Sequence, residues 1–167
     1  MGGLIIDANG KRFANELGRR DYVTGEMWKN KPPFRLCLNK AAQEEIIWHC
    51  KHYTGRGVMK FFENGKALAA EIGCPVSVLE EEHQQHYEAS QKQASDPEGG
   101  PWPAYPSGKG WDAPSGKTGS GKKFYHNVIP GSRVADEPFY VAIITPVIHY
   151  CMGGLETSAD GECVKAD

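Results

Sequence analysis

The sequence FRLCLNKAAQEEIIWHCKHY, residues 34–53, decides the fold class because its hydrophobic spacing changes within one stretch. Residues 34–38 alternate in the manner of a half-buried β-strand. Asn39 is a favourable helix N-cap, and apolar side chains at helical spacing follow it over residues 41–53. The stretch therefore predicts a strand that leads into a helix.

The flanking sequence extends this pattern in both directions. At the N-terminal end, residues 3–6 predict a strand, Asn9-Gly10 a hairpin turn and residues 11–13 a return strand. Asp21 is a plausible N-cap for the next helix. The remaining predicted helices cover 22–28, 65–72 and 76–93, and the remaining predicted strands cover 138–145, 147–152 and 155–157. Helices in the first half with strands at both ends predict an α+β fold, a small mixed helix-and-sheet domain.

Residues 94–123 differ from the rest, with seven Gly, five Pro and no Val, Ile, Leu or Phe. Such a composition predicts a flexible insertion loop within one domain spanning residues 1–167. Residues 116–122 have the spacing of a phosphate-binding loop, but Lys123 stands where that loop needs Ser or Thr for magnesium. A flexible linker is therefore the favoured interpretation of this segment.

Composition excludes several classes of partner. The formal net charge is −2 over 167 residues, which gives no basic field for nucleic acid. No apolar run reaches the roughly 20 residues of a membrane span, and residues 1–9 lack the pattern of a secretory signal. Both ends of the sequence look like cut points in a longer chain.

The cysteines and histidines do not form a recognisable metal motif. Five cysteines without a Cys-x-x-Cys pair argue against a disulfide framework and a zinc ribbon, and fit a reducing compartment such as the cytosol or an organelle. We expect most of these thiols to be buried. Two histidine pairs, His49/His52 and His83/His86, stand at i, i+3 on predicted helices but lack further ligands. We expect both pairs to lie on solvated helix faces and predict no metal site.

Two motifs near the ends resemble one enzyme family. Residues 10–21, GKRFANELGRRD, resemble the G-x-R-F-x-N-E-x-x-x-R-D segment of the fumarate reductase and succinate dehydrogenase flavoproteins. Residues 145–154, TPVIHYCMGG, resemble the T-P-x-x-H-[HY]-x-M-G-G strand of the same family. The Thr-Pro form is most similar to the soluble, single-chain fumarate reductases. The two motifs occur in the family's order.

The resemblance implies roles for individual residues. Arg20 matches the arginine that donates a proton to fumarate, and Arg19 is its neighbour. His149 matches the histidine that holds a substrate carboxylate. Asp21 orients Arg20, with Gly153 and Gly154 as supporting residues. Without the resemblance, Arg20 would be interpreted as a structural ion-pair partner of Asp21 or Glu16, and His149 as a core histidine.

The resemblance also implies a division of the enzyme. The cofactor is FAD in a parent oxidoreductase that reduces fumarate to succinate, but this chain lacks the G-x-G-x-x-G fingerprint. The chain is therefore expected to be the substrate-capping domain, to bind no cofactor itself, to act with the flavin-binding domain of the same polypeptide and to be inactive alone. The family's "H-G-A-N-R", "H-P-T" and "T-E-x-x-R-G" elements are absent. A free-standing dicarboxylate- or partner-binding module, or a cap for another substrate such as aspartate, remains an alternative.

Overall fold

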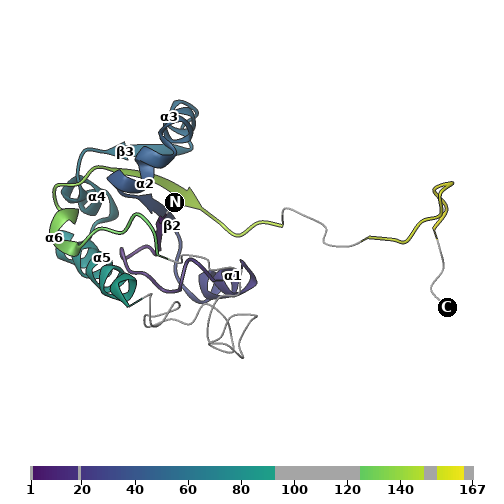
Figure 1. Cartoon of the computed structure of the whole chain (residues 1–167), viewed down its shortest axis with the longest axis horizontal. Helices are drawn as coiled ribbons and strands as arrows, with labels where there is room; N and C mark the ends of the chain where they lie inside the picture. The colour runs from purple at the N-terminus through teal and green to yellow at the C-terminus, as the bar shows by residue number, and fades with distance from the viewer. Residues whose placement is uncertain (1, 19, 93–124, 149–153, 164–167) are drawn as a thin grey trace.

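The structure is a computed structural model that describes residues 2–18, 20–92, 125–148 and 154–163. Within these ranges, helices cover both faces of one antiparallel sheet, which confirms the α+β prediction (Figure 1). The strands are β1 Leu4–Ile6, β2 Phe34–Leu38, β3 Met59–Phe62 and β4 Phe139–Ile144, in the spatial order β1-β2-β4-β3. The helices are α1 Arg20–Lys29, α2 Lys40–Glu45, α3 Ile47–Gly55, α4 Gly65–Ile72, α5 Val76–Gln91 and α6 Gly131–Val134.

The register of the sheet sorts its side chains onto two faces. Cys37 of β2 pairs with Leu4 of β1 on one side and with Val141 of β4 on the other. Because successive strand residues point to opposite faces, these three share one face and their chain neighbours share the other. Each face then packs against a different set of helices.

The face of Cys37 and Val141 packs against α4, α5 and α6 through one buried cluster, which comprises Ile6, Cys37, Phe62, Leu68, Ala69, Leu79, Ile129, Val134, Phe139 and Val141. The opposite face meets α2 and α3 through Leu38, Ala42, Cys50, Met59, Tyr140 and Ala142. It meets α1 through Phe13, Ala14, Met27 and Phe34. Phe13 and Ala14 thus pack beside both the sheet and α1.

Local signals explain where the helices begin and end. Asn39 caps α2 as predicted, because its side chain accepts a hydrogen bond from the backbone N–H of Ala42 at 3.0 Å. Asn64 caps α4 in the same way, and Gly73, with φ of +83°, ends that helix in the left-handed conformation. The helix predicted over 41–53 is instead two helices, because the backbone departs from helical geometry at Ile46 (φ −131°, ψ 33°).

Other elements differ from the predictions. β3 and α6 are additional elements, each of only four residues, too short for a periodic pattern to be recognised. The predicted return strand at 11–13 is reduced to an isolated bridge between Ile6 and Arg12. Residues 147 and 148 lie outside any strand, and Thr157 forms only an isolated bridge with Cys163. The predicted loop at 94–123, with its 116–122 segment, lies outside the described residues.

Candidate functional site

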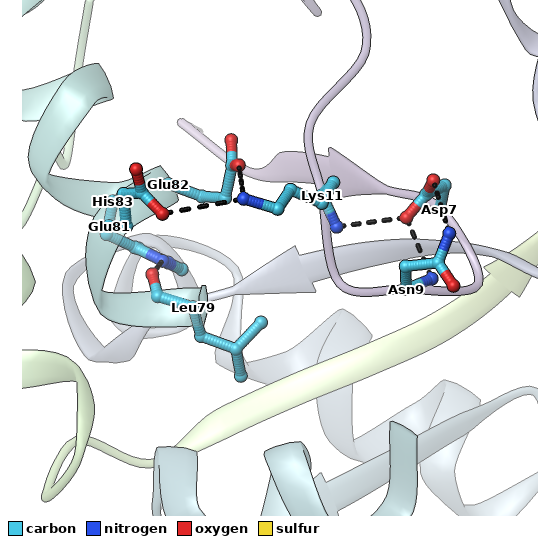
Figure 2. Close-up of polar contacts among 7 residues, drawn as sticks. All are labelled: Asp7, Asn9, Lys11, Leu79, Glu81, Glu82 and His83. Carbon is cyan, nitrogen blue, oxygen red and sulfur yellow. Dashed lines mark hydrogen bonds and ion pairs between the residues drawn. The ribbon is translucent and has the colours of Figure 1, made fainter. Parts of the chain in front are cut away.

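The candidate site begins with a tight turn at residues 7–11, which precedes Arg19 and Arg20 in the first motif. The Asp7 carboxylate accepts hydrogen bonds from the backbone N–H groups of Asn9 (2.8 Å) and Lys11 (2.9 Å) (Figure 2). Gly10 adopts φ of +78°, and a Cβ at this position would lie 3.0 Å from the Sγ atom of Cys74. Both constraints explain why a glycine stands at this point of the motif.

A buried ion pair follows the turn. The Arg12 guanidinium donates to both oxygens of Glu16, Nε to Oε1 at 2.8 Å and Nη2 to Oε2 at 2.7 Å. The side chains of Arg12 and Glu16 are 4% and 7% exposed. Burial alone would lower the pKa of Arg12, but the hydrogen bond and the charge of Glu16 outweigh it and raise that pKa. Arg12 therefore stays ionised, and it holds Glu16 in a bidentate geometry that is specific for arginine.

Arg20 is exposed at the first residue of α1. Within the described residues it pairs with neither Asp21 nor Glu16, since the Glu16 carboxylate is occupied by Arg12. The structural interpretation of Arg20 as an ion-pair partner is therefore wrong for this part of the chain. An exposed cation at this position can meet an anionic ligand without first breaking a contact within the described residues.

The prediction that Asp21 caps the helix is wrong. α1 begins at Arg20, so Asp21 is its second residue and lies in the first turn. The predicted helix start, Tyr22, is two residues late, because the carboxylate of Asp21 is favourable either as a capping side chain or as a negative charge beside the positive end of the helix dipole.

Sequence reasoning missed a buried polar face on α5. It predicted a solvated face for His83 and His86, yet these side chains are only 4% and 5% exposed. The His83 Nδ1 atom lies 2.8 Å from the carbonyl oxygen of Leu79, and its ring meets the Phe139 ring edge-on, with centroids 5.5 Å apart. Burial lowers the pKa of His83 to about 4 and that of His86 to about 3.

A signal for this burial was present in the sequence. The buried positions of α5 are Leu79, Glu82, His83, His86, Ala89 and Ser90, which follow helical spacing from the apolar Leu79. The prediction failed because Glu and His are usually exposed, and their position on the apolar stripe was given too little weight. The other pair, His49 and His52, is exposed as predicted, with His52 stacked on Trp48.

Glu82 connects the buried face of α5 to the motif segment. Its side chain is 5% exposed, and its Oε1 atom lies 3.6 Å from the Nζ atom of Lys11. Burial raises the pKa of Glu82, while a hydrogen bond with the backbone of Arg12 and the charge of Lys11 act against that shift. Lys11 also reaches Glu81 at 3.4 Å (Figure 2). These contacts fasten residues 11 and 12 to α5.

The second motif leaves the sheet where β4 ends at Ile144 (Figure 1). Val147 and Ile148 are 73% and 97% exposed, which is unusual for aliphatic side chains that follow a core strand. His149 and Gly153 lie outside the described residues, and Gly154 is exposed. The structure therefore does not test whether His149 lies near Arg20, and its assignment stays a prediction.

An apolar cavity of about 550 Å³ lies elsewhere, between the sheet and α3. Its lining residues are Gly3, Leu36, Leu38, Ile46, His49, Cys50, Tyr53, Val58, Met59 and Ala142. None of them belongs to the two motifs. No group of three potential metal ligands occurs within the described residues, and no helix among them is long and apolar enough to cross a membrane.

The described fold differs from the folds that usually hold FAD. Dinucleotide pyrophosphates are usually held where a parallel βαβ unit presents a helix N-terminus. In the described ranges the sheet is antiparallel throughout, and each of its strand pairs is formed without a parallel crossover. The described residues therefore contain no parallel βαβ unit that would present a helix N-terminus to the pyrophosphate of FAD.

Comparison with known proteins gives one consistent result. A family described as FAD binding domain matches residues 1–167. A fumarate reductase of Schizosaccharomyces pombe is 29% identical over 166 residues, which cover 99% of this chain and 27% of that protein. This chain thus spans about a quarter of the length of that relative.

Two solved structures share the fold at low sequence identity. One is the open conformation of a flavocytochrome c3 fumarate reductase, with a TM-score of 0.52 and 18% identity over 97% of this chain and 25% of that one. The other is a 3-ketosteroid Δ1-dehydrogenase from Sterolibacterium denitrificans, with a TM-score of 0.51 and 18% identity over 86% of this chain and 27% of that one. At such identities these structures establish similarity of fold.

Proposed function

The chain belongs to the FAD binding domain family of the flavin-dependent fumarate reductases, and from that premise we propose that it is the substrate-capping part of such an enzyme. In this proposal Arg20 donates a proton to fumarate and His149 binds a substrate carboxylate, with Asp21, Gly153 and Gly154 in support. FAD is held by the remainder of the parent polypeptide, and this chain alone is inactive.

The observation that carries the proposal is the state of the charged residues in the first motif. Glu16 lies one helical turn before Arg20 in the sequence and is the carboxylate that could pair with it from that distance. In the structure, Glu16 instead accepts hydrogen bonds from Arg12. Arg20 is left exposed at the start of α1. A purely structural arginine would be expected to have a partner, whereas an arginine that receives a dianion must be available to it.

The reaction makes these residue types reasonable. Fumarate takes up a hydride at one alkene carbon and a proton at the other to give succinate, so one electron pair and one proton must arrive from different sources. The flavin of the parent enzyme is the hydride source. As hydride arrives, the second carbon becomes strongly basic, and the Arg20 guanidinium can transfer a proton to it although arginine is normally a very weak acid. His149 can stabilise the carboxylate that absorbs the developing charge.

Exposed apolar side chains support a role within a larger protein. Trp28 at the end of α1 is 76% exposed, Ile143 in β4 is 67% exposed, and Val147 and Ile148 beyond β4 are more than 70% exposed. These side chains come from α1, from β4 and from the segment after β4, and exposed apolar surface is where another protein surface can pack. A cap that closes over a flavin-bearing domain would cover such residues and exclude water from the substrate.

Substitutions in the full-length flavoprotein test this proposal. Arg20→Gln should lower fumarate turnover by about 10²–10⁴-fold, the usual effect of losing a general acid, while FAD content stays normal. His149→Ala should raise KM and lower kcat together. Arg19→Gln is the matched control and should cost far less. Equal losses at Arg19 and Arg20, or near-normal turnover in Arg20→Gln, would contradict the assignment.

A further inference from the structure

Within the described residues, no hydrogen bond or ion pair of the Arg20 side chain fixes its position. An acid must be held to within a fraction of an ångström of the carbon it protonates, and a displacement of about 1 Å can cost 10²-fold in rate. The position of Arg20 must therefore be set by the backbone that leads to it. Three sets of contacts determine the path of that backbone.

The first set anchors the segment to the sheet. The Glu16 Oε1 atom accepts a hydrogen bond from the backbone N–H of Ile5 in β1 at 3.1 Å, in addition to the one from Arg12. Arg12 in turn forms the isolated bridge with Ile6. The Arg12–Glu16 pair thus closes residues 12–16 into a loop whose two ends are both fastened to β1.

The second set joins this loop to α1. Tyr22 packs against the cluster beside α1 that contains Phe13 and Ala14. Burial raises the pKa of its hydroxyl, and the backbone of Asn15 acts against that shift. The Asn15 side chain also accepts a hydrogen bond from the backbone N–H of Leu17 at 3.0 Å. Tyr22 lies two residues after Arg20, so the loop holds the first turn of α1 directly.

The third set supports the loop from behind. Lys11 reaches Glu81 and Glu82 of α5 at 3.4 and 3.6 Å (Figure 2). The backbone of Arg12 also lowers the pKa of Glu82, against the larger effect of burial. The Arg12 side chain is itself buried, with 4% of it exposed. A buried pair of charges is expensive to desolvate and contributes little net stability, so its value must lie elsewhere, and specifying one conformation is a known use of such pairs.

We propose that the buried Arg12–Glu16 ion pair is a positioning element that fixes where α1 presents Arg20, acting through Asn15 and Tyr22. The inference rests on the proposed function, because it gives the ion pair a role in the proton transfer assigned to Arg20. Arg12 and Glu16 do not touch the substrate in this proposal, and their effect on turnover is indirect.

The test uses the full-length flavoprotein and the variant Glu16→Gln, which keeps the size of the side chain but removes the charge. We expect kcat to fall about 10–100-fold while KM changes less, because the acid is misplaced and the other binding groups are not. FAD content and the rate of flavin reduction by the electron donor should match those of the unmodified enzyme. Tyr22→Phe, which removes one hydroxyl, should lower kcat in the same direction by a smaller factor.

The matched control is Leu68→Ala, a truncation in α4 at a side chain that is 1% exposed on the opposite face of the sheet. It destabilises the domain without touching the loop, and its kcat below the melting temperature should be normal. If Leu68→Ala loses as much kcat as Glu16→Gln, general destabilisation explains the effect and the inference is overturned. If Glu16→Gln cannot be purified, Tyr22→Phe is the deciding variant. A kcat of Tyr22→Phe that is no lower than the kcat of Leu68→Ala also overturns the inference.

The outcome separates this inference from the proposed function. Loss of turnover in Arg20→Gln together with normal kcat in Glu16→Gln would leave Arg20 as the acid and remove the positioning role of the ion pair. Normal turnover in Arg20→Gln would remove the proposed function itself, whatever the result for Glu16→Gln. Loss in both, with a normal Leu68→Ala control, supports both.

Discussion

The buried histidines of α5 predict a steep loss of stability in mild acid. Burial lowers the pKa of His83 from 6.5 to about 4 and that of His86 to about 3. Both imidazoles are thus neutral in the folded state near pH 5, whereas in the unfolded chain they bind protons below pH 6.5. The free energy of unfolding is therefore unaffected by these histidines above pH 6.5, and it decreases as the pH falls from 6.5 toward their pKa values in the folded state.

The size of the loss follows from these values. Between pH 7 and pH 5 each histidine lowers the free energy of unfolding by about 2 kcal/mol, so the pair lowers it by about 4 kcal/mol. Glu82, whose pKa is raised by burial, acts in the opposite direction, because protonation favours its buried state. Replacing one histidine isolates its share from the contribution of Glu82.

The assay is urea unfolding of this chain at pH 7 and pH 5, followed by tryptophan fluorescence. His86→Phe retains an aromatic ring against Tyr125, which lies 5.3 Å away between centroids. Between pH 7 and pH 5, the free energy of unfolding of this variant should therefore fall by about 2 kcal/mol less than that of the unmodified chain. The control is His49→Gln, at an exposed histidine. A chain equally stable at both pH values, or a His86→Phe variant with the full pH dependence, would refute the burial argument.

Two further predictions concern other buried features. Gly10→Ala should lower the free energy of unfolding by about 1–3 kcal/mol in urea, because alanine is strained at φ of +78° and its Cβ would crowd α5. The control is Gly25→Ala, inside α1 with nothing within 4 Å of its Cβ, which should leave the stability unchanged or raise it. Equal losses of stability at both sites would contradict this prediction. Burial raises the pKa of the Cys37 thiol to about 12, so at pH 8 a thiol reagent should modify exposed Cys163 quickly and Cys37 only after unfolding; rapid modification of Cys37 in the native state would contradict it.

The elements with strong local signals were predictable from sequence. The helix over 65–72 has an Asn cap before it and a Gly stop after it, and the structure gives these same bounds. The strand predicted over 34–38 from its alternation has those bounds, and the strand predicted over 138–145 is observed at Phe139–Ile144. β3 was not predicted, because a four-residue edge strand carries too little periodicity and forms only by pairing with β4, far along the chain.

The candidate site was predictable only in part. The motif located Arg20, but nothing in local sequence indicated that Arg12 and Glu16 would form a buried pair rather than two surface charges. That pairing depends on β1, which supplies the Ile5 amide, and on the burial of the Arg12 side chain in the folded chain. Tertiary contacts of this kind decide burial, and residue type alone predicts the opposite for Arg, Glu and His.

The most direct test of the account is a single-turnover measurement on the full-length flavoprotein. The enzyme is reduced without oxygen and mixed rapidly with fumarate, and reoxidation of the flavin is followed by absorbance. The account predicts that Arg20→Gln is reduced at the normal rate but is reoxidised by fumarate about 10²–10⁴-fold more slowly than the unmodified enzyme. Reoxidation of Arg20→Gln at the unmodified rate would contradict the central claim that Arg20 supplies the proton.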